Sequence, residues 1–379
     1  MSGTGERGSA AIFHKPAYES SHLNYTPSVF RKLIYEIDPL TDPRWPGFIA
    51  RHSQASIFHT PEWLGCLHRT YGYTPIVYTS TPPGEELQNG LLFCRVNSWL
   101  TGRRLVSLPF SDHCEPLAHD TASLRELLPE ITQINSAPRT KYIELRPLNS
   151  LYSENIKGAG LQESERFYHH RIDLRPEKNA LFSAFHRDCV KRKIRRAERE
   201  GLDYRQGRSD VLLRDFYYLM LLTRRRHRLV PQPFSWFRNL ARSLCDSMQI
   251  RAAYHKSRPV AAIVTLTHKN SMIYKYGCSD ERFSALGGTQ MLFWQTIQEA
   301  CDKGLVEFDL GRTEIDNTGL IAFKDRWGAS RTELTYWRCP PAHSPVKIPE
   351  SSSFFRQALA RAPLPLLQLA GTFLYRHAG

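Results

Sequence analysis

The sequence predicts an α/β protein with mixed sheets, organised as two domains. Apolar runs of strand length alternate with helical segments from residue 57 onward, which is typical of helices packed on sheets. The 379 residues amount to about two domains of ordinary size. Composition shifts to Ser, Asn and Gly over residues 149–160, which indicates a connection between the domains. We therefore predict a mobile N-terminal tail, two domains and a C-terminal amphipathic segment, over residues 1–30, 31–155, 156–340 and 341–379.

The first domain is expected to contain one early helix followed by short strands. Trp63, Leu64 and Leu67 recur at helical spacing within Pro61–Tyr71. Pro82-Pro83-Gly84 marks a turn between the first two strands. The predicted strands are residues 76–78, 91–96, 105–108 and 142–145.

The second domain is expected to begin with a strand over Tyr168–Leu174 and a long basic helix. Pro176 suits the first turn of that helix, and Gly201 followed by Leu202 is a typical helix end after Glu200. The apolar residues of this helix recur every three to five positions and predict a buried stripe: Phe182, Phe185, Val190, Ile194 and Ala197. Further helices are expected over 210–228, 235–246 and 289–303, and strands over 250–255, 260–267, 271–277 and 306–310, with two strand-like pieces after them. This order of elements resembles the core of GNAT acyltransferases.

Charge and cysteine usage narrow the class of protein. The 51 basic and 37 acidic residues give a net charge of +14, which favours anionic partners such as nucleic acid, phosphorylated substrates or an acidic membrane. Residues 161–260 hold 23 basic and 11 acidic residues, so nearly the whole excess lies in the second domain. The eight cysteines contain no C-x-x-C pair, which excludes a zinc module and a disulfide scaffold. Without a signal peptide or a run of 18 apolar residues, the protein is expected to be cytoplasmic.

The clearest chemical motif runs from Phe308 to Thr313 (F-D-L-G-R-T) and is followed by G-L-I-A-F-K-D-R-W-G at residues 319–328. Strand alternation places Phe308 and Leu310 on one face of the sheet and Asp309 on the other. Gly311 is expected to end the strand, so that Asp309, Arg312 and Thr313 cluster where open α/β sheets bind ligands. On periodicity alone, a pair between Asp309 and Arg312 with a solvated Lys324 would explain the same residues.

The F-D-x-G-R…F-K-x-x-W-G pattern resembles the Fem-type (FemAB/FemABX) branch of the GNAT superfamily. Four further segments match that family in order: Phe58–Leu64, Ser107–Asp112, Ile143–Arg146 and Phe185–Leu202. The resemblance spans about residues 57–338 and points most closely to Fem-related proteins of exosortase and exopolysaccharide loci. It implies two GNAT-like acyltransferase domains flanking a cleft, the first on the acceptor side and the second on the donor side. The best-known members of the family move an aminoacyl group from tRNA to an amine of a peptidoglycan precursor.

The resemblance places Lys324 beside the acyl end of the donor. A fixed ammonium there can stabilise the oxyanion that forms when an amine attacks an ester or thioester carbonyl. From strand geometry we predict that Asp309 orients Lys324 or accepts a proton from the attacking amine. Lys324 and Asp309 are the predicted catalytic residues.

Two basic segments are candidates for binding an anionic donor. Arg192 and Arg195 belong to a stripe at three- and four-residue spacing that suits phosphates, and a solvated helix face is the alternative. Arg226 and His227 lie in a run that closes a helix, where cations also complement the helix dipole.

Gly287, Gly288 and Thr289 stand where acetyltransferases hold the pyrophosphate of coenzyme A on backbone amides. The full acetyltransferase spacing is missing, which puts coenzyme A in doubt. A glycine turn with Thr289 as the helix N-cap is the alternative.

The remaining candidates are cleft residues. Asp112 lies on the turn that the resemblance assigns to the acceptor side, and Arg312 follows the strand motif. Tyr276 and Trp327 are expected as cleft walls, with core packing as the alternative. No metal site is predicted, because the histidines and cysteines nearest to this turn lack paired ligand spacing: His59, Cys66, His68, His113 and Cys114.

The C-terminal stretch 353–377 is too short, and too interrupted by Pro363 and Pro365, to span a bilayer. Its apolar residues and flanking arginines suit either a peripheral helix on the anionic inner face of a membrane or a helix packed on the domain.

We therefore predict a Fem-type N-acyltransferase that transfers an aminoacyl group to an amine of a cell-envelope precursor, either peptidoglycan or polysaccharide. Its donor is aminoacyl-tRNA or acyl-CoA, with no tightly bound cofactor, and a lipid-linked acceptor would suit a membrane contact. The first alternative is an acyl-CoA-dependent N-acyltransferase on an amino sugar in exopolysaccharide synthesis. The second is a nucleic-acid-binding protein without catalysis.

Overall fold

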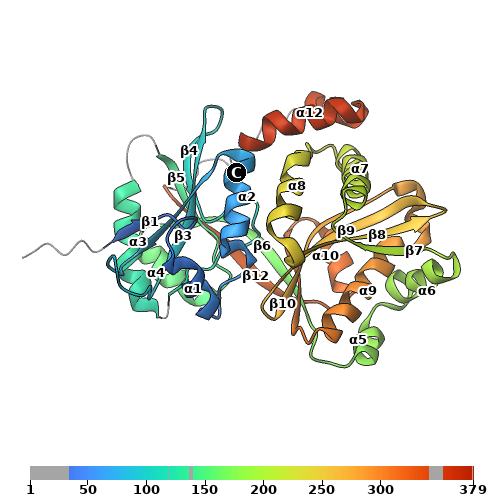
Figure 1. Cartoon of the computed structure of the whole chain (residues 1–379), viewed down its shortest axis with the longest axis horizontal. Helices are drawn as coiled ribbons and strands as arrows, with labels where there is room; N and C mark the ends of the chain where they lie inside the picture. The colour runs from blue at the N-terminus through green and yellow to red at the C-terminus, as the bar shows by residue number, and fades with distance from the viewer. Residues whose placement is uncertain (1–33, 119, 136–139, 341–352, 378) are drawn as a thin grey trace, which may run out of the picture. The chain divides into compact units, whose positions relative to one another are not determined.

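The computed structural model describes residues 34–118, 120–135, 140–340, 353–377 and 379 (Figure 1). The predicted tail (1–30) and residues 341–352 of the predicted C-terminal segment lie outside them. The strands are β1 (Tyr35–Ile37), β2 (Thr74–Thr79), β3 (Leu91–Ser98), β4 (Gly102–Val106), β5 (Thr140–Leu145), β6 (Gln162–Asp173), β7 (Asp203–Gly207), β8 (Met248–His255), β9 (Arg258–His268), β10 (Ser271–Ser279), β11 (Glu307–Glu314) and β12 (Ser330–Cys339). The α-helices are α1 (Arg44–Arg51), α2 (Pro61–Tyr71), α3 (Thr121–Asn135), α4 (Ser153–Gly158), α5 (Lys178–Ala184), α6 (Arg192–Arg199), α7 (Asp210–His227), α8 (Phe234–Ser243), α9 (Gly288–Asp302), α10 (Thr318–Asp325), α11 (Ser353–Arg361) and α12 (Leu364–Leu374).

The described strands form one mixed sheet that runs through both halves of the chain. Its order is β1-β2-β3-β4-β5-β12-β6-β11-β10-β9-β8-β7. Strand β12 pairs antiparallel with β5 on one side and with β6 on the other, so it joins the two halves. The predicted α/β class with mixed sheets is confirmed, because parallel pairs (β4–β5 and β10–β11) occur among antiparallel ones.

Helices cover both faces of the sheet in the second half, as Figure 1 shows. Helices α5, α6 and α9 pack on one face, where Phe185, Ile194 and Phe293 are buried. Helices α7 and α8 pack on the other face together with α2 of the first half. Trp63 of α2 and Trp236 of α8 meet edge to face, with 5.3 Å between ring centroids. This second core therefore spans both halves.

The long helix predicted from Pro176 to Glu200 is interrupted. Helix α5 ends before Phe185, whose backbone is extended, and a π-helical turn over Arg187–Lys191 leads into α6. The break occurs because the His186 side chain accepts hydrogen bonds from the backbone amides of Asp188 and Cys189 and caps a new helical segment. The predicted stripe is still buried at Phe185, Val190, Ile194 and Ala197, since the two segments present their apolar residues to the same core. Where two strand-like pieces were expected after β11, the chain forms α10 and a single strand, β12.

The C-terminal helices pack on the domain and fasten the chain end to the first half. Leu359 and Leu367 are buried, and Gly371 lies against the backbone of Pro231. The Tyr73 hydroxyl donates to the carbonyl of Arg376 (2.9 Å), and Arg104 donates to that of His377 (3.0 Å). No described helix is long and apolar enough to cross a bilayer.

Candidate active site

Strands β10 and β11 open a gap in the sheet. They pair in parallel only from Ser271–Ile273 to Glu307–Asp309, and then separate. The register of β11 shifts between Asp309 and Gly311, where Gly311 adopts a positive φ of 73° that favours glycine. Strand β11 continues past this bulge to Glu314, so the prediction that Gly311 ends the strand is wrong. Beyond Ile273 the edge of β10 has no β11 partner, and at its end the amide of Ser279 donates to the Thr223 hydroxyl (2.9 Å). The stretch between them leaves backbone groups facing the gap.

A pocket of about 280 Å³ lies where the two strands separate, and we call it the splay pocket. It brings together five of the predicted site residues: Asp112, His227, Tyr276, Arg312 and Lys324. The rest of its lining comes from α7, β10, β11, α10 and the segment after α7: Met220, Thr223, Arg224, Leu229, Tyr274, Lys275, Gly277, Leu310, Gly311 and Leu320.

Lys324 is buried and held by the backbone of the bulge. Its ammonium donates to the carbonyls of Gly311 (2.8 Å) and Arg312 (3.0 Å), so its position is fixed relative to the strand end. Burial lowers the pKa of Lys324 to about 8, although the charges of Asp112 and Asp309 oppose that shift. A cation with this pKa is still largely protonated at neutral pH.

Asp112 enters the pocket from the first half, and Lys275 pairs with it at 3.1 Å. The Lys275 ammonium also lies 5.1 Å from the ring centroid of Phe58 and 5.9 Å from that of Trp63. These contacts explain the aromatic residues of the F-H-T-P-E-W-L segment, which support a buried cation. Burial would raise the pKa of the Asp112 carboxyl, and Lys275 and Arg312 outweigh burial and lower it. Asp112 is therefore a carboxylate at neutral pH.

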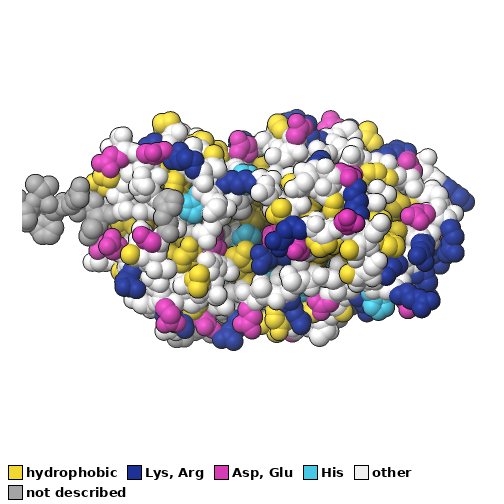
Figure 2. Space-filling view, turned by 90° about the horizontal axis from the view of Figure 1, so that it is seen from below, with side chains coloured by type: hydrophobic (Ala, Val, Ile, Leu, Met, Phe, Trp, Pro, Cys, Tyr) yellow, Lys and Arg dark blue, Asp and Glu magenta, His cyan; other side chains and the backbone are white. Residues whose placement is uncertain are grey.

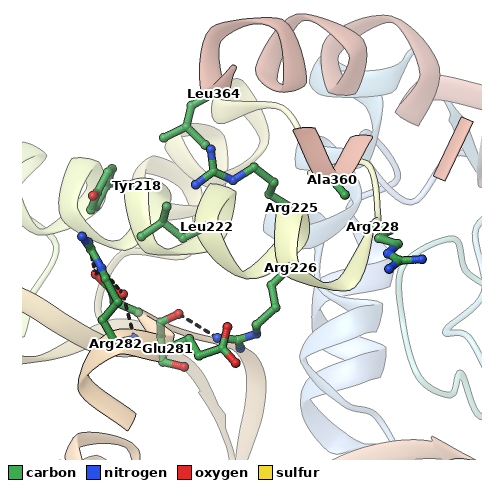
Figure 3. A pocket seen from close by; sticks show the side chains of 11 residues that line it. Tyr218, Leu222, Arg225, Arg226, Arg228, Glu281, Arg282, Ala360 and Leu364 are labelled. Carbon is green, nitrogen blue, oxygen red and sulfur yellow. Dashed lines mark hydrogen bonds and ion pairs between the residues drawn. The ribbon is translucent and has the colours of Figure 1, made fainter. Parts of the chain in front are cut away.

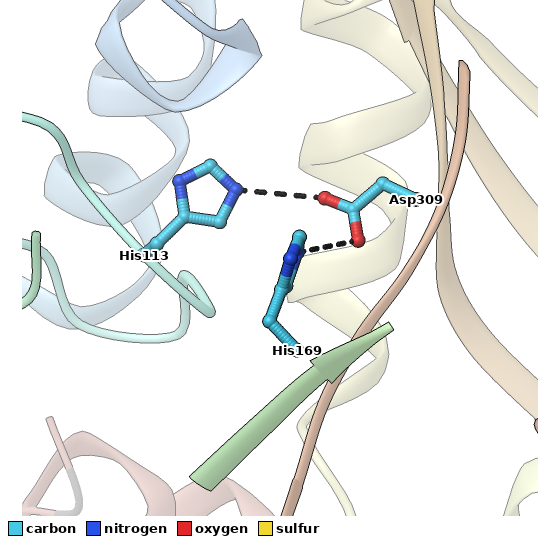
Figure 4. Close-up of side chains that lie close together, drawn as sticks. All are labelled: His113, His169 and Asp309. Carbon is cyan, nitrogen blue, oxygen red and sulfur yellow. Dashed lines mark ion pairs between the residues drawn. The ribbon is translucent and has the colours of Figure 1, made fainter. Parts of the chain in front are cut away.

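Asp309 has different partners from the one predicted. One carboxylate oxygen lies 2.8 Å from Nε2 of His169 and accepts from the amide of Gly311 (2.6 Å), and the other lies 3.5 Å from Nε2 of His113 (Figure 4). Burial would raise the pKa of Asp309, but the two histidines hold it well below its usual range. Asp309 thus ties the bulge of β11 to β6 and to the turn that carries Asp112. The described contacts of Lys324 do not include it.

His113, His169 and Asp309 are also a group that could hold a metal, since their ligand atoms lie within 4.8 Å of one another. Histidines that bind a metal nearly always donate their other ring nitrogen to a neighbour. Here Nδ1 of neither histidine has a hydrogen-bond partner among the described residues. Each imidazole also faces a separate oxygen of the carboxylate, so the geometry suits a shared carboxylate better than a metal centre.

The turn that carries Asp112 is anchored by a buried charge network. Arg146 donates to the carbonyls of Leu108 (2.6 Å) and Ser111 (3.3 Å), at the start of the turn. Glu144 of β5 is fully buried between Arg146 (2.6 Å) and Arg338 of β12. The network therefore positions Asp112 from strands that lie far apart in the sequence.

The other predicted residues lie elsewhere. Trp327 is buried against Phe185 and Phe293 in the core, so it is not a cleft wall. Arg226 faces away from His227 and lines a different pocket, because neighbouring helical residues differ by about 100° in direction.

Arg192 and Arg195 are exposed on α6 and are not part of the splay pocket. Arg192 faces Asp188 at 3.6 Å, one helical turn away. Figure 2 shows Lys and Arg side chains gathered at the end of the molecule that carries α6. The position of these two arginines fits a solvated helix face.

The predicted pyrophosphate turn is closely covered. Gly287 has a φ of 81° and is the N-cap of α9, so Thr289 lies inside the helix and is not its cap. A Cβ at Gly287 would collide with the backbone carbonyl of Lys193 in α6. Packing of α6 thus accounts for a glycine at position 287, and the facing carbonyl is unfavourable for a phosphate.

Substituting Gly287 with Ala tests this packing. We expect Gly287→Ala to lower the free energy of unfolding by about 1–3 kcal/mol more than Gly304→Ala, since overpacking adds to the cost of the left-handed backbone. Gly304 has a similar φ of 67° and open space around it, which makes it the matched control. Urea denaturation of both variants measures the difference. Equal losses would contradict tight contact between α6 and the turn.

Comparisons with known proteins agree with this geometry. Residues 184–325 match the model of the GNAT acetyltransferase domain. The structure of FemX superposes with a TM-score of 0.63 at 14% identity, covering 79% of this chain and 96% of that one. A tandem GNAT protein from the clavulanic acid biosynthesis pathway gives 0.53 at 12% identity, covering 82% and 99%. The C-terminal domain of a putative lysylphosphatidylglycerol synthetase from Agrobacterium fabrum gives 0.53 at 12% identity, covering 83% and 93%. The sequence has no match among curated proteins.

The separated strands, the pocket between them and the matched domain model point to one conclusion. Residues 184–325 form a GNAT acetyltransferase domain, which supports an acyltransferase activity, and the described fold as a whole resembles that of FemX.

Proposed function

We propose that the protein is an N-acyltransferase that passes an aminoacyl group to an amine of a cell-envelope precursor. The observation that carries this proposal is that one pocket contains both a fixed cation, Lys324, and a fixed carboxylate, Asp112. Lys324 is held by the carbonyls of the β11 bulge, and Asp112 comes from the other half of the chain.

The reaction follows from these positions. The donor carbonyl enters the gap between β10 and β11, where Lys324 and the free edge of β10 stabilise the oxyanion as the amine attacks. The acceptor amine is bound as an ammonium beside the Asp112 carboxylate and must lose a proton before attack. Asp112 orients the amine and accepts that proton directly or through water. Collapse of the tetrahedral intermediate then breaks the ester or thioester bond, and the departing alcohol or thiol takes up the second proton from the attacking nitrogen.

Acceptors with several polar groups are favoured by a second pocket beside the same turn. This pocket has a volume of about 590 Å³, and its lining includes His113, Glu115, Arg171 and Glu333. Charges of both signs suit a glycan or peptide precursor better than a fatty chain.

An aminoacyl-tRNA donor is favoured by the covered turn at Gly287. Coenzyme A needs a cradle of amides for its pyrophosphate, and the carbonyl of Lys193 faces that place. The exposed arginines of α6 supply positive charge for a polyanionic donor.

An acyl-CoA donor on an amino sugar is the second candidate. It is favoured by the match of residues 184–325 to the acetyltransferase domain. The open edge of β10 would then hold the amide-bearing arm of the donor.

Label transfer separates the two donors. Purified protein is given labelled aminoacyl-tRNA or labelled acyl-CoA together with a pool of envelope precursors, and products are separated by chromatography. We expect transfer from tRNA, lowered about 10²- to 10³-fold in the Lys324→Met variant. Transfer from acyl-CoA alone would replace the first donor with the second. Absence of transfer from either would contradict the proposal.

A further inference from the structure

We infer that the outer side of α7, together with α12, is a docking site for a membrane rich in anionic phospholipid. The inference concerns a surface away from the splay pocket and does not depend on the proposed acceptor or donor. It rests on an arginine-rich pocket and on an exposed apolar stripe on the outward side of α12, whose first turn lines that pocket.

The pocket, which we call the outer pocket, has a volume of about 600 Å³. Arg225, Arg226 and Arg228 line it from the end of α7, and Ala360 and Leu364 line it from the C-terminal helices. In Figure 3 the three guanidinium groups point in different directions, and that of Arg228 is turned away from Tyr218 and Leu222. Its remaining lining is Tyr218, Leu222, Ser279, Asp280, Glu281 and Arg282. Phosphate-binding side chains thus stand next to apolar ones, as an amphiphilic ligand requires.

The charge of the outer pocket is only partly neutralised by the protein. Arg282 pairs with Asp280 through several hydrogen bonds, and Arg226 donates to the carbonyl of Ser279 at 3.5 Å. Arg225 and Arg228 have no ion pair with any residue in the described part of the chain. Two arginine forks are therefore available for phosphate oxygens.

Helix α7 separates this pocket from the catalytic one. Met220, Thr223, Arg224 and His227 face the splay pocket, whereas Tyr218, Leu222, Arg225 and Arg226 face the outer pocket. At 100° per residue these two sets lie on opposite sides of the helix. The outer pocket is thus a separate site.

Helix α12 supplies the apolar part of the surface. Leu367 and Gly371 are buried on the side that packs against the domain. Leu366, Leu369 and Phe373 share another side at three- and four-residue spacing, and they are 59%, 54% and 63% exposed. Leu364, at the first turn of α12, lines the outer pocket from the side of the helix that packs on the domain, so the stripe lies on the outward side of the same helix.

A membrane fits this combination better than tRNA does. Each arginine near an anionic surface contributes about 1 kcal/mol to binding. The apolar stripe can insert into the membrane interface, whereas a nucleic acid backbone offers no apolar region to contact it.

Flotation with lipid vesicles tests the site in the full chain. We expect binding to vesicles of phosphatidylcholine with 30 mol% phosphatidylglycerol, and little binding to phosphatidylcholine alone. The double variant Arg225→Glu/Arg228→Glu should lower the partition coefficient at least tenfold, as should Leu366→Ser/Leu369→Ser/Phe373→Ser. The matched controls Arg192→Glu/Arg195→Glu and Leu151→Ser/Val211→Ser alter exposed residues on other surfaces and should bind like the wild type.

Several results would overturn the inference. Equal binding to both vesicle types would show that the arginines do not recognise anionic lipid. Loss of binding only in the α6 variant would assign the membrane site to α6 instead. If the α7 variant lost binding to total tRNA and kept vesicle binding, the outer pocket would be a nucleic acid site. If the α12 variant changed only the sedimentation of the protein, the stripe would be an interface between copies of this chain.

Discussion

Replacing Lys324 with Met or Ala is expected to lower kcat about 10²- to 10³-fold. Loss of one preorganised donor to an oxyanion has an effect of this size. The ammonium is fixed by two carbonyl oxygens, so it needs no reorganisation as charge develops on the substrate. Steady-state kinetics with the donor that the label-transfer experiment identifies measure the effect.

The Met variant controls for packing, because it keeps the volume of the lysine stem in a buried position. Circular dichroism melts of both variants report whether the fold is retained. Wild-type turnover in a folded variant would eliminate the oxyanion role.

The pH dependence of the wild type gives a second readout of Lys324. Its pKa of about 8 means that the ammonium is present below pH 8 and is lost as the pH rises through that value. We therefore expect kcat to decline above pH 8, although the acceptor amine itself becomes more reactive there. The residual activity of Lys324→Met should lack this alkaline decline. A decline that persists in the variant would assign it to another group.

Replacing Glu144 with Ala is expected to reduce the free energy of unfolding by about 3–5 kcal/mol. The substitution leaves the guanidinium groups of Arg146 and Arg338 buried without their shared counter-ion. Activity should fall as well, because Arg146 holds the turn that carries Asp112. Urea denaturation measures the stability change.

Glu165→Ala is the matched control for this substitution. Glu165 also pairs with Arg338, at 3.1 Å, but its side chain is 34% exposed. The Glu165 carboxylate remains in contact with water, and Arg338 keeps its bond to Glu144, so this substitution should change stability by no more than about 1 kcal/mol. Similar losses for Glu144 and Glu165 would contradict the assignment of the network's stability to the buried carboxylate.

Many strands and helices could be predicted from local sequence patterns, and two residues of the pocket from the resemblance to the Fem-type family. The apolar runs located the predicted strands, and the F-K and P-F-S-D segments identified Lys324 and Asp112. Lys275 and His169 were missed, because their partners come from other strands and turns that only tertiary pairing brings near. A lysine between two tyrosines in a buried strand was the available signal for Lys275.

The other differences between prediction and structure arise where a local contact or helix geometry overrides the pattern of the sequence. His186 interrupts a continuous helical pattern because its imidazole bonds to two backbone amides. Arg226 and His227 are adjacent in sequence but separate in space, since a helix turns successive side chains apart. Trp327 belongs to the same motif as Lys324, yet its large apolar ring is buried in the core.

The order in which strands leave the ribosome has a consequence for when the protein becomes active. The turn of Asp112 is held late in the chain, because the Tyr336 hydroxyl donates to the Asp112 carbonyl (2.6 Å) and Arg338 completes the network around Glu144. A nascent chain that ends before β12 therefore has all of β11 and Lys324, but its turn at Asp112 is unsecured and one edge of β5 is unpaired. We therefore expect a chain that ends before β12 is complete to expose an aggregation-prone edge and to lack the contacts that fix the turn of Asp112.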